Sequence, residues 1–385
     1  MKKKRFFLAI LFLLLSKSAL FASTSKGVVL PRNIIIMIGD GMGVGAISAY
    51  CLANTNSNFF RFKNIALMST YADGSLVTDS AAGGTALATG FKTKNGYVST
   101  LPDGTHLETI MEVAKKKGKS TGIVVTCSVT HATPATFYAH VSSRGNEAEI
   151  ATFATNQTID VFIGGGLSFF TPTPSQQTLT TQYTEANPGQ QTINLLEIMS
   201  NLGYKIITNY EEFALYTPTK TEKLLALLES MHLPPALNTN RKTSLPEMTK
   251  KSLDILSKSK NGFVLMIEGS QIDWEAHGNN AKGLIAEMSD FDKTIGVVLD
   301  FAQKSGDTLV IVTSDHETGG VGIIGGVVGK STTIRFLSKD HTGVLVPTFS
   351  YGPGSENFLG IIDNTFIGKK LIEILSGSSP NQTKN

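Results

Sequence analysis

Acidic and histidine side chains occur in the sequence at spacings that suit metal-assisted catalysis. Asp273 and His277 stand four residues apart, which on a helix places both side chains on one face, as two ligands of one metal ion require. Asp315 and His316 are adjacent, so they can share a metal ion only on an irregular loop, and the glycine pair that follows them is consistent with one. Taken alone, an Asp/His pair at this helical spacing is more often a surface hydrogen bond, and an adjacent Asp-His pair after a strand is more often a solvated turn.

A hydroxyl group stands near the start of the segment TDSAAGGTALATG at 78–90. Asp79 and Ser80 precede a run of small residues, and both residue types are favoured at helix N-caps. A serine at this place also lies at the positive end of the helix dipole, where an alkoxide or a phosphate is stabilised. Ser80 can therefore be a helix-capping residue, a nucleophile, or both.

Seven short, largely β-branched runs predict strands that are buried on both faces of a sheet. Helix-like segments such as 107–117 and 283–302 lie between several of these runs. This alternation predicts an α/β fold with a large, mainly parallel central sheet and helices on both faces. The predicted strands are 33–38, 122–126, 160–163, 204–207, 262–267, 308–312 and 344–349.

Four of these runs end in polar residues that can bind metal ions. Asp40 follows the first run, Thr133 comes after the second, Glu268 ends the fifth, and Asp315 follows the sixth. Ligands of open α/β sheets bind beyond the carboxyl ends of the strands, so in a parallel sheet these four would converge. Histidines with carboxylates suit zinc, whereas Asp40, Glu268 and the Thr133 hydroxyl form an all-oxygen set that suits magnesium.

A glycine-rich run, GMGVGA at 41–46, is similar to a dinucleotide-binding turn. That turn requires an acidic residue about 20 positions further on to bind the ribose. No Asp or Glu occurs from 41 to 72. A nicotinamide or flavin cofactor is therefore disfavoured.

The first 22 residues have the pattern of a secretory signal peptide. Basic residues precede the apolar run 6–15, which is too short to cross a bilayer. Five of the 34 basic residues lie in this segment, and without them 29 basic residues face 31 acidic ones, a net charge of −2. We therefore expect an exported protein, periplasmic or secreted, without a membrane span after signal removal and without a nucleic-acid recognition surface.

The rest of the chain is expected to form one domain over 23–375, followed by a disordered tail at 376–385. The segment 168–244 is rich in Thr, Gln, Asn and Pro, which predicts surface loops with a helix or two and no catalytic residues. The glycine-rich segment 321–330 is interpreted as a mobile connection or a small edge hairpin. Both cysteines, at 51 and 127, lie in apolar context and are expected to be buried free thiols.

Six motifs between about Pro31 and Gly354 occur in the same order and at similar spacing as those of the alkaline phosphatases. They are IGDGMG, TDSAAGGTALATG, THATPA with Ser143-Arg144 beyond it, EGSQIDWEAH, SDHETGG and a later histidine, His341. The sequence thus resembles the alkaline phosphatase family, and its motif detail resembles members from cold-adapted bacteria. The resemblance implies an alkaline phosphatase-like α/β fold. It also implies hydrolysis of a broad range of small phosphate monoesters through a phosphoserine intermediate, releasing inorganic phosphate and an alcohol.

The resemblance also implies a role for each site residue, two Zn²⁺ and one Mg²⁺ per subunit, and a possible homodimer. Ser80 would be the nucleophile, Arg144 would clamp the phosphoryl group, and Asp79 would orient Arg144. The implied metal ligands are Asp273, His277 and His341 for the first zinc, Asp40, Ser80, Asp315 and His316 for the second, and Asp40, Thr133 and Glu268 for magnesium.

Two positions depart from the pattern of the enteric enzymes. His131 stands where those enzymes have Asp, and Trp274 stands where they have Lys; both variants resemble the cold-adapted members. His131 would alter the magnesium affinity or recruit a different metal ion. Trp274 cannot pair with phosphate oxygens as Lys does, so weaker phosphate binding and faster release are expected. The short segment 316–341 indicates that the lid-like insertion of larger members is small or absent.

Other functions remain open at this point. A phosphodiesterase or nucleotide pyrophosphatase of the same superfamily would more commonly have Thr at the position of Ser80 and would lack the Arg144 clamp. A metal-free serine hydrolase would need only Ser80 with one His and one Asp, and would resist chelators. A non-catalytic zinc-binding protein would not need Ser80 and Arg144 together. A sulfatase would need a C/S-x-P-x-R setting, which is absent around Ser80.

Overall fold

A computed structural model describes residues 30–171, 194–218 and 222–377. The expected signal peptide and most of the expected tail therefore lie outside the described residues. Within them, ten strands form one sheet in the order β14-β2-β13-β8-β1-β7-β3-β4-β6-β5. Their bounds are β1 (Asn33–Gly39), β2 (Asn64–Ser69), β3 (Ser120–Ser128), β4 (Val161–Gly165), β5 (Tyr204–Ile207), β6 (Lys223–Leu227), β7 (Phe263–Gly269), β8 (Thr308–Thr313), β13 (Val346–Tyr351) and β14 (Gly360–Asp363).

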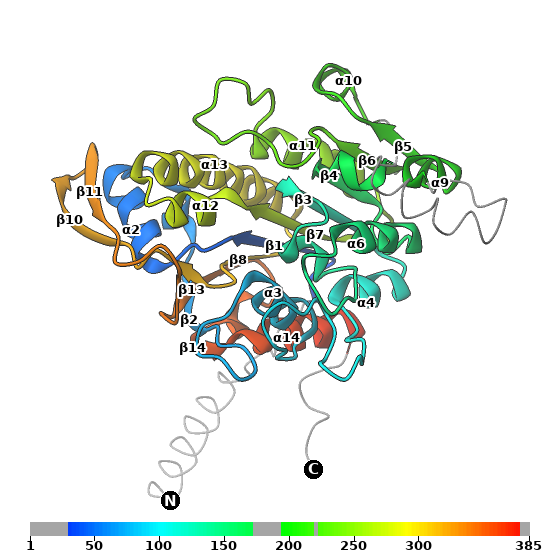
Figure 1. Cartoon of the computed structure of the whole chain (residues 1–385). Coiled ribbons are helices and arrows are strands. Elements are labelled where there is room, and N and C mark those ends of the chain that lie inside the picture. Colours follow the sequence, from blue (N-terminus) through cyan, green and yellow to red (C-terminus); the bar gives the residue numbers. More distant parts are fainter. Residues whose placement is uncertain (1–29, 172–193, 219–221, 378–385) are drawn as a thin grey trace, which may run out of the picture.

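The helices lie on both faces of this sheet. Figure 1 shows α11, α12 and α13 above it and α3, α4 and α14 below it. The α-helices are α2 (Val44–Ala53), α3 (Ser80–Thr89), α4 (Ile110–Lys116), α5 (Ala132–Ala135), α6 (Glu147–Phe153), α7 (Leu167–Phe170), α9 (Leu195–Asn201), α10 (Tyr210–Leu215), α11 (Leu245–Leu256), α12 (Gln271–His277), α13 (Ala281–Ser305) and α14 (Asn364–Ser376). Short 3-10 turns are η2 (Asn58–Arg61), η3 (Ala154–Asn156) and η4 (Ser355–Asn357).

The alternation of side chains along a strand divides the core into two layers. In β1, Ile34, Ile36 and Ile38 pack into the core between the sheet and the helices α3, α4 and α14. Ile35 and Met37 point the other way, into the core between the sheet and the helices α2, α11 and α13. A strand buried on both faces must be apolar throughout, which is why the central strands have continuous apolar sequences.

The predicted fold class is confirmed: β13 is antiparallel to β2 and β8, and the other neighbouring strands of the sheet are parallel. All seven predicted strands form, and the two predicted helices correspond to α4 and α13. Three strands of the ten-stranded sheet were not predicted, namely β2, β6 and β14. β6 corrects the expectation for 168–244, where only loops and helices were predicted apart from the strand at 204–207, because its sequence KLLAL is almost wholly buried between β4 and β5.

Two small sheets extend from the loop that follows β8. β10 (Gly322–Val327) and β11 (Ser331–Arg335) form an antiparallel hairpin, which confirms the edge-hairpin interpretation of the glycine-rich segment. β9 (Glu317–Thr318) pairs with β12 (His341–Thr342). The two cysteines are buried and form no disulfide in the described structure, as expected. None of the described helices combines the length and apolar character needed to cross a membrane.

Candidate active site

The polar strand ends predicted to converge do lie at one edge of the sheet. β8, β1, β7 and β3 are consecutive parallel strands, so their carboxyl ends point in the same direction. Asp40 follows β1, Glu268 lies near the end of β7, Asp315 follows β8, and Thr133 lies in α5 after β3. All four side chains are completely buried. Buried carboxylates require a charge partner or a metal ion, so their convergence is the central chemical feature of the fold.

The loops after β1 and β8 are tied together by Ser314. Its hydroxyl oxygen accepts a hydrogen bond from the backbone N–H of Met42 at 2.8 Å and lies 2.7 Å from the carbonyl oxygen of Gly39. Gly41 adopts a φ of +68°, and a side chain there would meet Asp273 and Thr318. This tight turn brings Asp40 next to the loop that contains Asp315.

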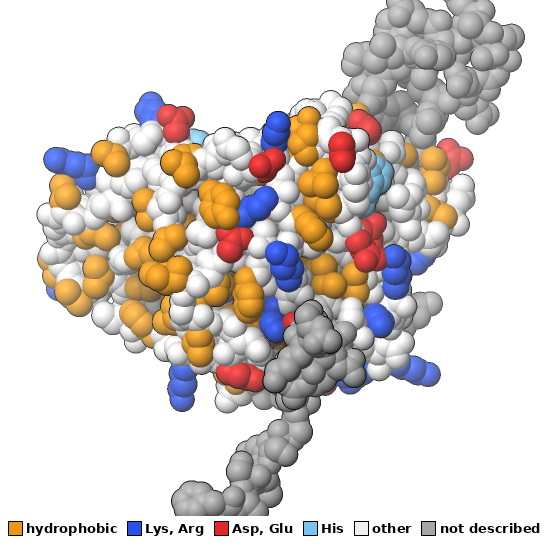
Figure 2. Space-filling model, turned by 90° about the horizontal axis from the view of Figure 1, so that it is seen from below, with side chains coloured by type: hydrophobic (Ala, Val, Ile, Leu, Met, Phe, Trp, Pro, Cys, Tyr) orange, Lys and Arg blue, Asp and Glu red, His pale blue; other side chains and the backbone are white. Residues whose placement is uncertain are grey.

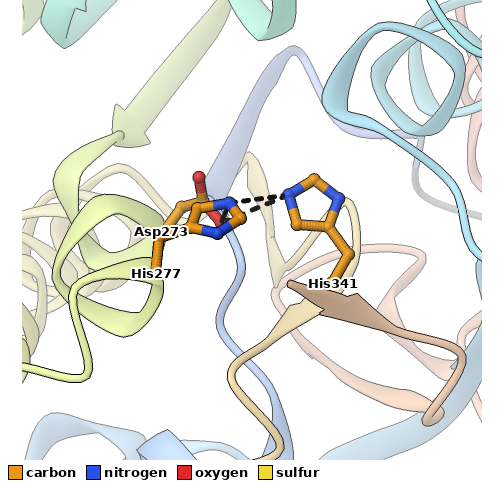
Figure 3. A group of neighbouring side chains, drawn as sticks. All are labelled: Asp273, His277 and His341. Carbon is orange, nitrogen blue, oxygen red and sulfur yellow. Dashed lines mark hydrogen bonds and ion pairs between the residues drawn. The ribbon is translucent and has the colours of Figure 1, made fainter. Parts of the chain in front are cut away.

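The first candidate metal group consists of Asp273, His277 and His341. Figure 3 shows the three side chains pointing toward one another, the first two from α12 and the third from β12. The Asp273 Oδ1 lies 3.3 Å from the Nε2 of His277 and 3.6 Å from the Nε2 of His341. The predicted helical spacing of Asp273 and His277 is therefore present, and the β9–β12 pairing adds His341.

The orientation of these imidazole rings fits a cation. The Nδ1 of His277 faces the carbonyl oxygen of Lys339, and that of His341 lies 2.9 Å from the carbonyl oxygen of Thr78. Both Nε2 atoms therefore face inward, 3.0 Å apart. The hydrogen bond with Asp273 is the main cause that raises the pKa of His277 to about 9, so this arrangement favours positive charge on the ring.

The second candidate metal group consists of Asp40, Asp315 and His316, all completely buried. The Nε2 of His316 lies 3.4 Å from Oδ1 of Asp40 and 3.3 Å from Oδ2 of Asp315. Burial, followed by the negative charges of Asp315, Asp273 and Glu268, raises the pKa of Asp40 well above its ordinary value. Positive charge is needed here to keep these carboxylates ionised.

The all-oxygen set of Asp40, Thr133 and Glu268 also fits a cation. Both carboxylate oxygens of Asp40, the Thr133 hydroxyl and Oε1 of Glu268 are buried and accept no hydrogen bond from any described residue. Burial, and then the charge of Asp315, raises the pKa of Glu268 to about 7 despite a hydrogen bond from Ser270. Unpaired buried oxygens of this kind are the ligands that magnesium prefers.

Ser80 is the first residue of α3 and faces the second group. Asp79 is the N-cap of this helix, and its Oδ1 accepts a hydrogen bond from the backbone N–H of Ala82 at 2.9 Å. The Ser80 hydroxyl oxygen lies 3.2 Å from the Nε2 of His316. The glycines of α3 permit this approach, because a Cβ on Gly83 would lie only 2.8 Å from the carbonyl oxygen of Asp315.

Arg144 is held beside this helix by Asp79. The Oδ2 of Asp79 accepts hydrogen bonds from the Arg144 guanidinium at 3.1 Å and from the backbone N–H of Gly96 at 3.0 Å. The backbone N–H of Arg144 donates to the carbonyl oxygen of Gly96 at 2.8 Å. The expected orienting contact between Asp79 and Arg144 is therefore present in the structure.

His131, the N-cap of the helix α5 that contains Thr133, forms an aromatic wall with Trp274 and a third ring. The ring centroids of His131 and Trp274 are 5.7 Å apart, and His232 packs on Trp274 at 4.7 Å and near His131 at 5.8 Å. Burial, and then the charge of Arg144, lowers the pKa of His131 to about 3, so its ring is neutral. His232 lies in the segment expected to carry no catalytic residues, so that segment does reach the site.

Two residues that contact predicted site residues were not predicted from the sequence. Thr318 hydrogen-bonds with members of both groups, and its only signal was its place directly after the Asp315-His316 pair. His232 was one of seven histidines in the chain, but no spacing linked it to the other site residues.

The fold and the site define a hydrolase of the metal-assisted phosphoryl-transfer class: a serine at a helix N-terminus, an arginine beside it, and carboxylate–histidine groups at the strand ends. The alkaline phosphatase family model matches residues 31–337. Alkaline phosphatase 4 of Bacillus subtilis is 32% identical over 429 residues, covering 89% of this chain and 88% of that protein.

Two solved structures from cold environments are also similar. The alkaline phosphatase of the Antarctic bacterium TAB5 is 37% identical with a TM-score of 0.80, covering 91% of this chain and all of that chain. The cold-active alkaline phosphatase of a psychrophilic Shewanella species is 31% identical with a TM-score of 0.77, covering 89% of this chain and 99% of that chain. The chain belongs to the alkaline phosphatase family. It is a phosphatase that hydrolyses phosphate monoesters.

Proposed function

We propose that this chain hydrolyses phosphate monoesters through a phosphoserine formed on Ser80, with two zinc ions and one magnesium ion per subunit. The observation that carries the proposal is the position of Ser80 at the start of α3, with its hydroxyl oxygen 3.2 Å from Nε2 of His316. The helix N-terminus favours a phosphoryl group at this place.

The donor sets support the proposed metals. Mixed imidazole and carboxylate groups suit zinc, and the buried oxygen set suits magnesium. When bound, the ions would supply positive charge for the attacking and leaving oxygens and would lower the pKa of water. The proposed ligands are Asp273, His277 and His341 for one zinc, Asp40, Ser80, Asp315 and His316 for the other, and Asp40, Thr133 and Glu268 for magnesium.

The identity of the ion in the oxygen set is proposed to depend on His131. Variants of the TAB5 enzyme in which a histidine is replaced by Asp or Glu have Mg bound in the M3 site. In this chain the Nδ1 of His131 is buried and bonds to no described residue. A neutral imidazole is a better ligand for zinc than for magnesium, so His131 favours competition between the two ions.

The residues of this chain then have separate tasks. Arg144 binds two phosphoryl oxygens through its planar guanidinium, and Asp79 keeps it in that orientation. The Ser80 oxygen forms a bond to phosphorus as the ester oxygen leaves with the alcohol. Water then breaks the bond between phosphorus and the Ser80 oxygen, which releases inorganic phosphate and restores the serine. Trp274 offers no cation to the product, so phosphate leaves readily.

Export and self-association complete the proposal. We propose export to the periplasm or medium, on the basis of the N-terminal sequence pattern.

A homodimer is supported by exposed apolar side chains: Phe60 is 63% exposed, Val328 74% and Ile361 76%. Figure 2 shows hydrophobic side chains over the left half of the lower face, where few charged groups interrupt them. Sedimentation velocity on the mature chain tests this, and a monomer at all concentrations would contradict it.

The experiment that tests the function measures release of nitrophenolate from p-nitrophenyl phosphate at mildly alkaline pH. The protein is assayed before EDTA treatment, after it, and after zinc and magnesium are restored. Activity lost to the chelator and regained with both metals is the expected result. Activity indifferent to EDTA would instead indicate a metal-free serine hydrolase. Activity on bis-p-nitrophenyl phosphate alone would indicate a diesterase.

A further inference from the structure

Thr318 lies between the two candidate metal groups and contacts both. It is completely buried in the short strand β9. Its hydroxyl oxygen is 2.5 Å from Oδ1 of Asp273, in the first group, and 3.2 Å from Nδ1 of His316, in the second. One side chain thus hydrogen-bonds to both groups, which also touch directly where the rings of His316 and His341 stack with their centroids 3.6 Å apart.

The hydrogen-bonding capacity of these three groups fixes the direction of both bonds. The Asp273 carboxylate can only accept, so the one proton of the Thr318 hydroxyl is donated to it. The hydroxyl oxygen is then free to accept from His316, which must carry its proton on Nδ1. When His316 is a neutral imidazole, as a metal-binding histidine is, its Nε2 then carries no proton, and it is this atom that faces Ser80, Asp40 and Asp315.

The backbone of Thr318 holds the hydroxyl at this place. Its N–H donates to the carbonyl oxygen of Gly41 at 3.1 Å, in the turn that follows Asp40. In the β9–β12 pair, Thr318 stands opposite His341. The room for its hydroxyl is provided by Gly41, where a Cβ would lie 2.6 Å from the Thr318 oxygen. The position of Thr318 is therefore fixed relative to both metal groups.

We propose that Thr318 is a positioning residue that links the two metal groups, selecting the Nε2-binding tautomer of His316 and orienting the Asp273 carboxylate with the same hydroxyl. This rests on the proposed metal binding. Residues that orient metal ligands in this way change metal affinity by about 10–100-fold when they are removed. Because one hydroxyl serves both groups, its loss weakens both of them. Removing the hydroxyl of a threonine with a purely structural role would leave the metal affinity of both groups unchanged.

The test is calorimetric titration of Zn²⁺ into the full, metal-free protein, which requires no catalytic activity. Thr318→Val removes the hydroxyl at nearly constant shape, and Thr318→Ser keeps it. Thr249→Val is the matched control, since Thr249 is buried in α11 and its hydroxyl bonds to no described residue. Circular dichroism and thermal unfolding of each metal-free variant verify that it folds.

We expect Thr318→Val to weaken both zinc-binding events by about 10–100-fold, while Thr318→Ser and Thr249→Val bind as the wild type does. Unchanged affinities in Thr318→Val would overturn the inference, as would weakening confined to one of the two events. Binding by Thr318→Ser as weak as that of Thr318→Val would show that the hydroxyl is not responsible. A wild-type protein that binds no zinc would refute the metal assignment itself, which distinguishes the two failures.

Discussion

The two oxygens of the Asp79 carboxylate have different partners: one caps the helix that begins at Ser80, and the other lies 3.1 Å from the guanidinium of Arg144 and also accepts from the backbone N–H of Gly96. The helix start and the arginine are therefore fixed by the same side chain. A displacement of Asp79 would move the proposed nucleophile and the proposed phosphate clamp together.

Substitution of Asp79 separates these two tasks. Asp79→Ala should lower the free energy of unfolding by about 1 kcal/mol, because the helix loses its cap. Asp79→Ser should keep the cap and the stability, yet both variants should raise KM by up to about tenfold because Arg144 loses its partner. Thermal unfolding and steady-state kinetics measure the two effects. A normal KM in both variants would show that Arg144 is oriented without Asp79.

Arg144→Ala removes the planar cation that is proposed to bind two phosphoryl oxygens. We expect kcat/KM to fall by about 10²-fold, as for the loss of one preorganised donor in a transition state. Arg61→Ala is the control, since Arg61 pairs with Asp300 on the surface. Equal kinetics for the wild type and Arg144→Ala would remove this residue from the proposed site.

Ser80→Ala removes the proposed nucleophile and should reduce kcat by at least about 10³-fold. Ser75→Ala, in the loop before α3 and between the exposed residues Gly74 and Leu76, should leave kcat unchanged. Acid-quenched wild-type protein should also carry phosphate on the peptide that contains Ser80, which mass spectrometry detects. Near-normal turnover in Ser80→Ala would rule out the phosphoserine route.

Removal of metal should make stability depend on pH in a defined direction. The pKa of Glu268 is raised from 4.5 to about 7, chiefly by burial, so between these values the folded metal-free protein holds a proton that the unfolded chain has released. The free energy of unfolding therefore falls as pH rises from about 4.5 to about 7, by on the order of 3 kcal/mol from Glu268.

Thermal unfolding of the EDTA-treated protein between about pH 5 and pH 8 checks this, with Glu268→Gln as the variant that removes the effect. Glu149→Gln, on the surface, serves as control. The metal-loaded protein should show the opposite trend at low pH, because its ligands bind metal only when deprotonated. Parallel curves for the EDTA-treated wild type and Glu268→Gln would contradict the burial effect.

Substitution of Gly41 tests whether the space between this turn and the side chains of Thr318 and Asp273 matters for zinc binding. Gly41→Ala would place a Cβ 2.6 Å from the Thr318 hydroxyl and 2.8 Å from Oδ1 of Asp273. Gly74→Ala is a matched control, since Gly74 has a similar φ of +76° and open space around it. Each variant should lose about 1–2 kcal/mol of stability through backbone strain, but only Gly41→Ala should weaken zinc binding. Equal zinc affinities would show that the loop relaxes.

The central part of the site could be predicted from the sequence because its residues follow strands. The apolar runs before Asp40, Glu268 and Asp315 predict buried parallel strands, and the carboxyl ends of such strands meet at one edge of the sheet. The four-residue spacing of Asp273 and His277 likewise predicted that both side chains lie on one face of a helix. The roles proposed for these residues still depend on the family resemblance.

The remaining parts depend on tertiary contacts that no local pattern encodes. His341 reaches the first group only because β12 pairs with β9, and both strands are two residues long. β6 consists mainly of leucine, which has no strand signature until β4 and β5 bury it. His232 comes to the aromatic wall through a segment whose composition indicates loops, so its position became visible only in the structure.

The place of β1 between β7 and β8 means that the first strand of the described chain is completed by strands from its last third. A polypeptide that ends at β8 lacks His341, a proposed zinc ligand, so we expect such a truncated chain to be inactive. Assembly of such distant segments is also slow. We therefore expect enzyme activity to require the intact, folded polypeptide, and a single proteolytic cut before His341 that releases the C-terminal part should abolish it.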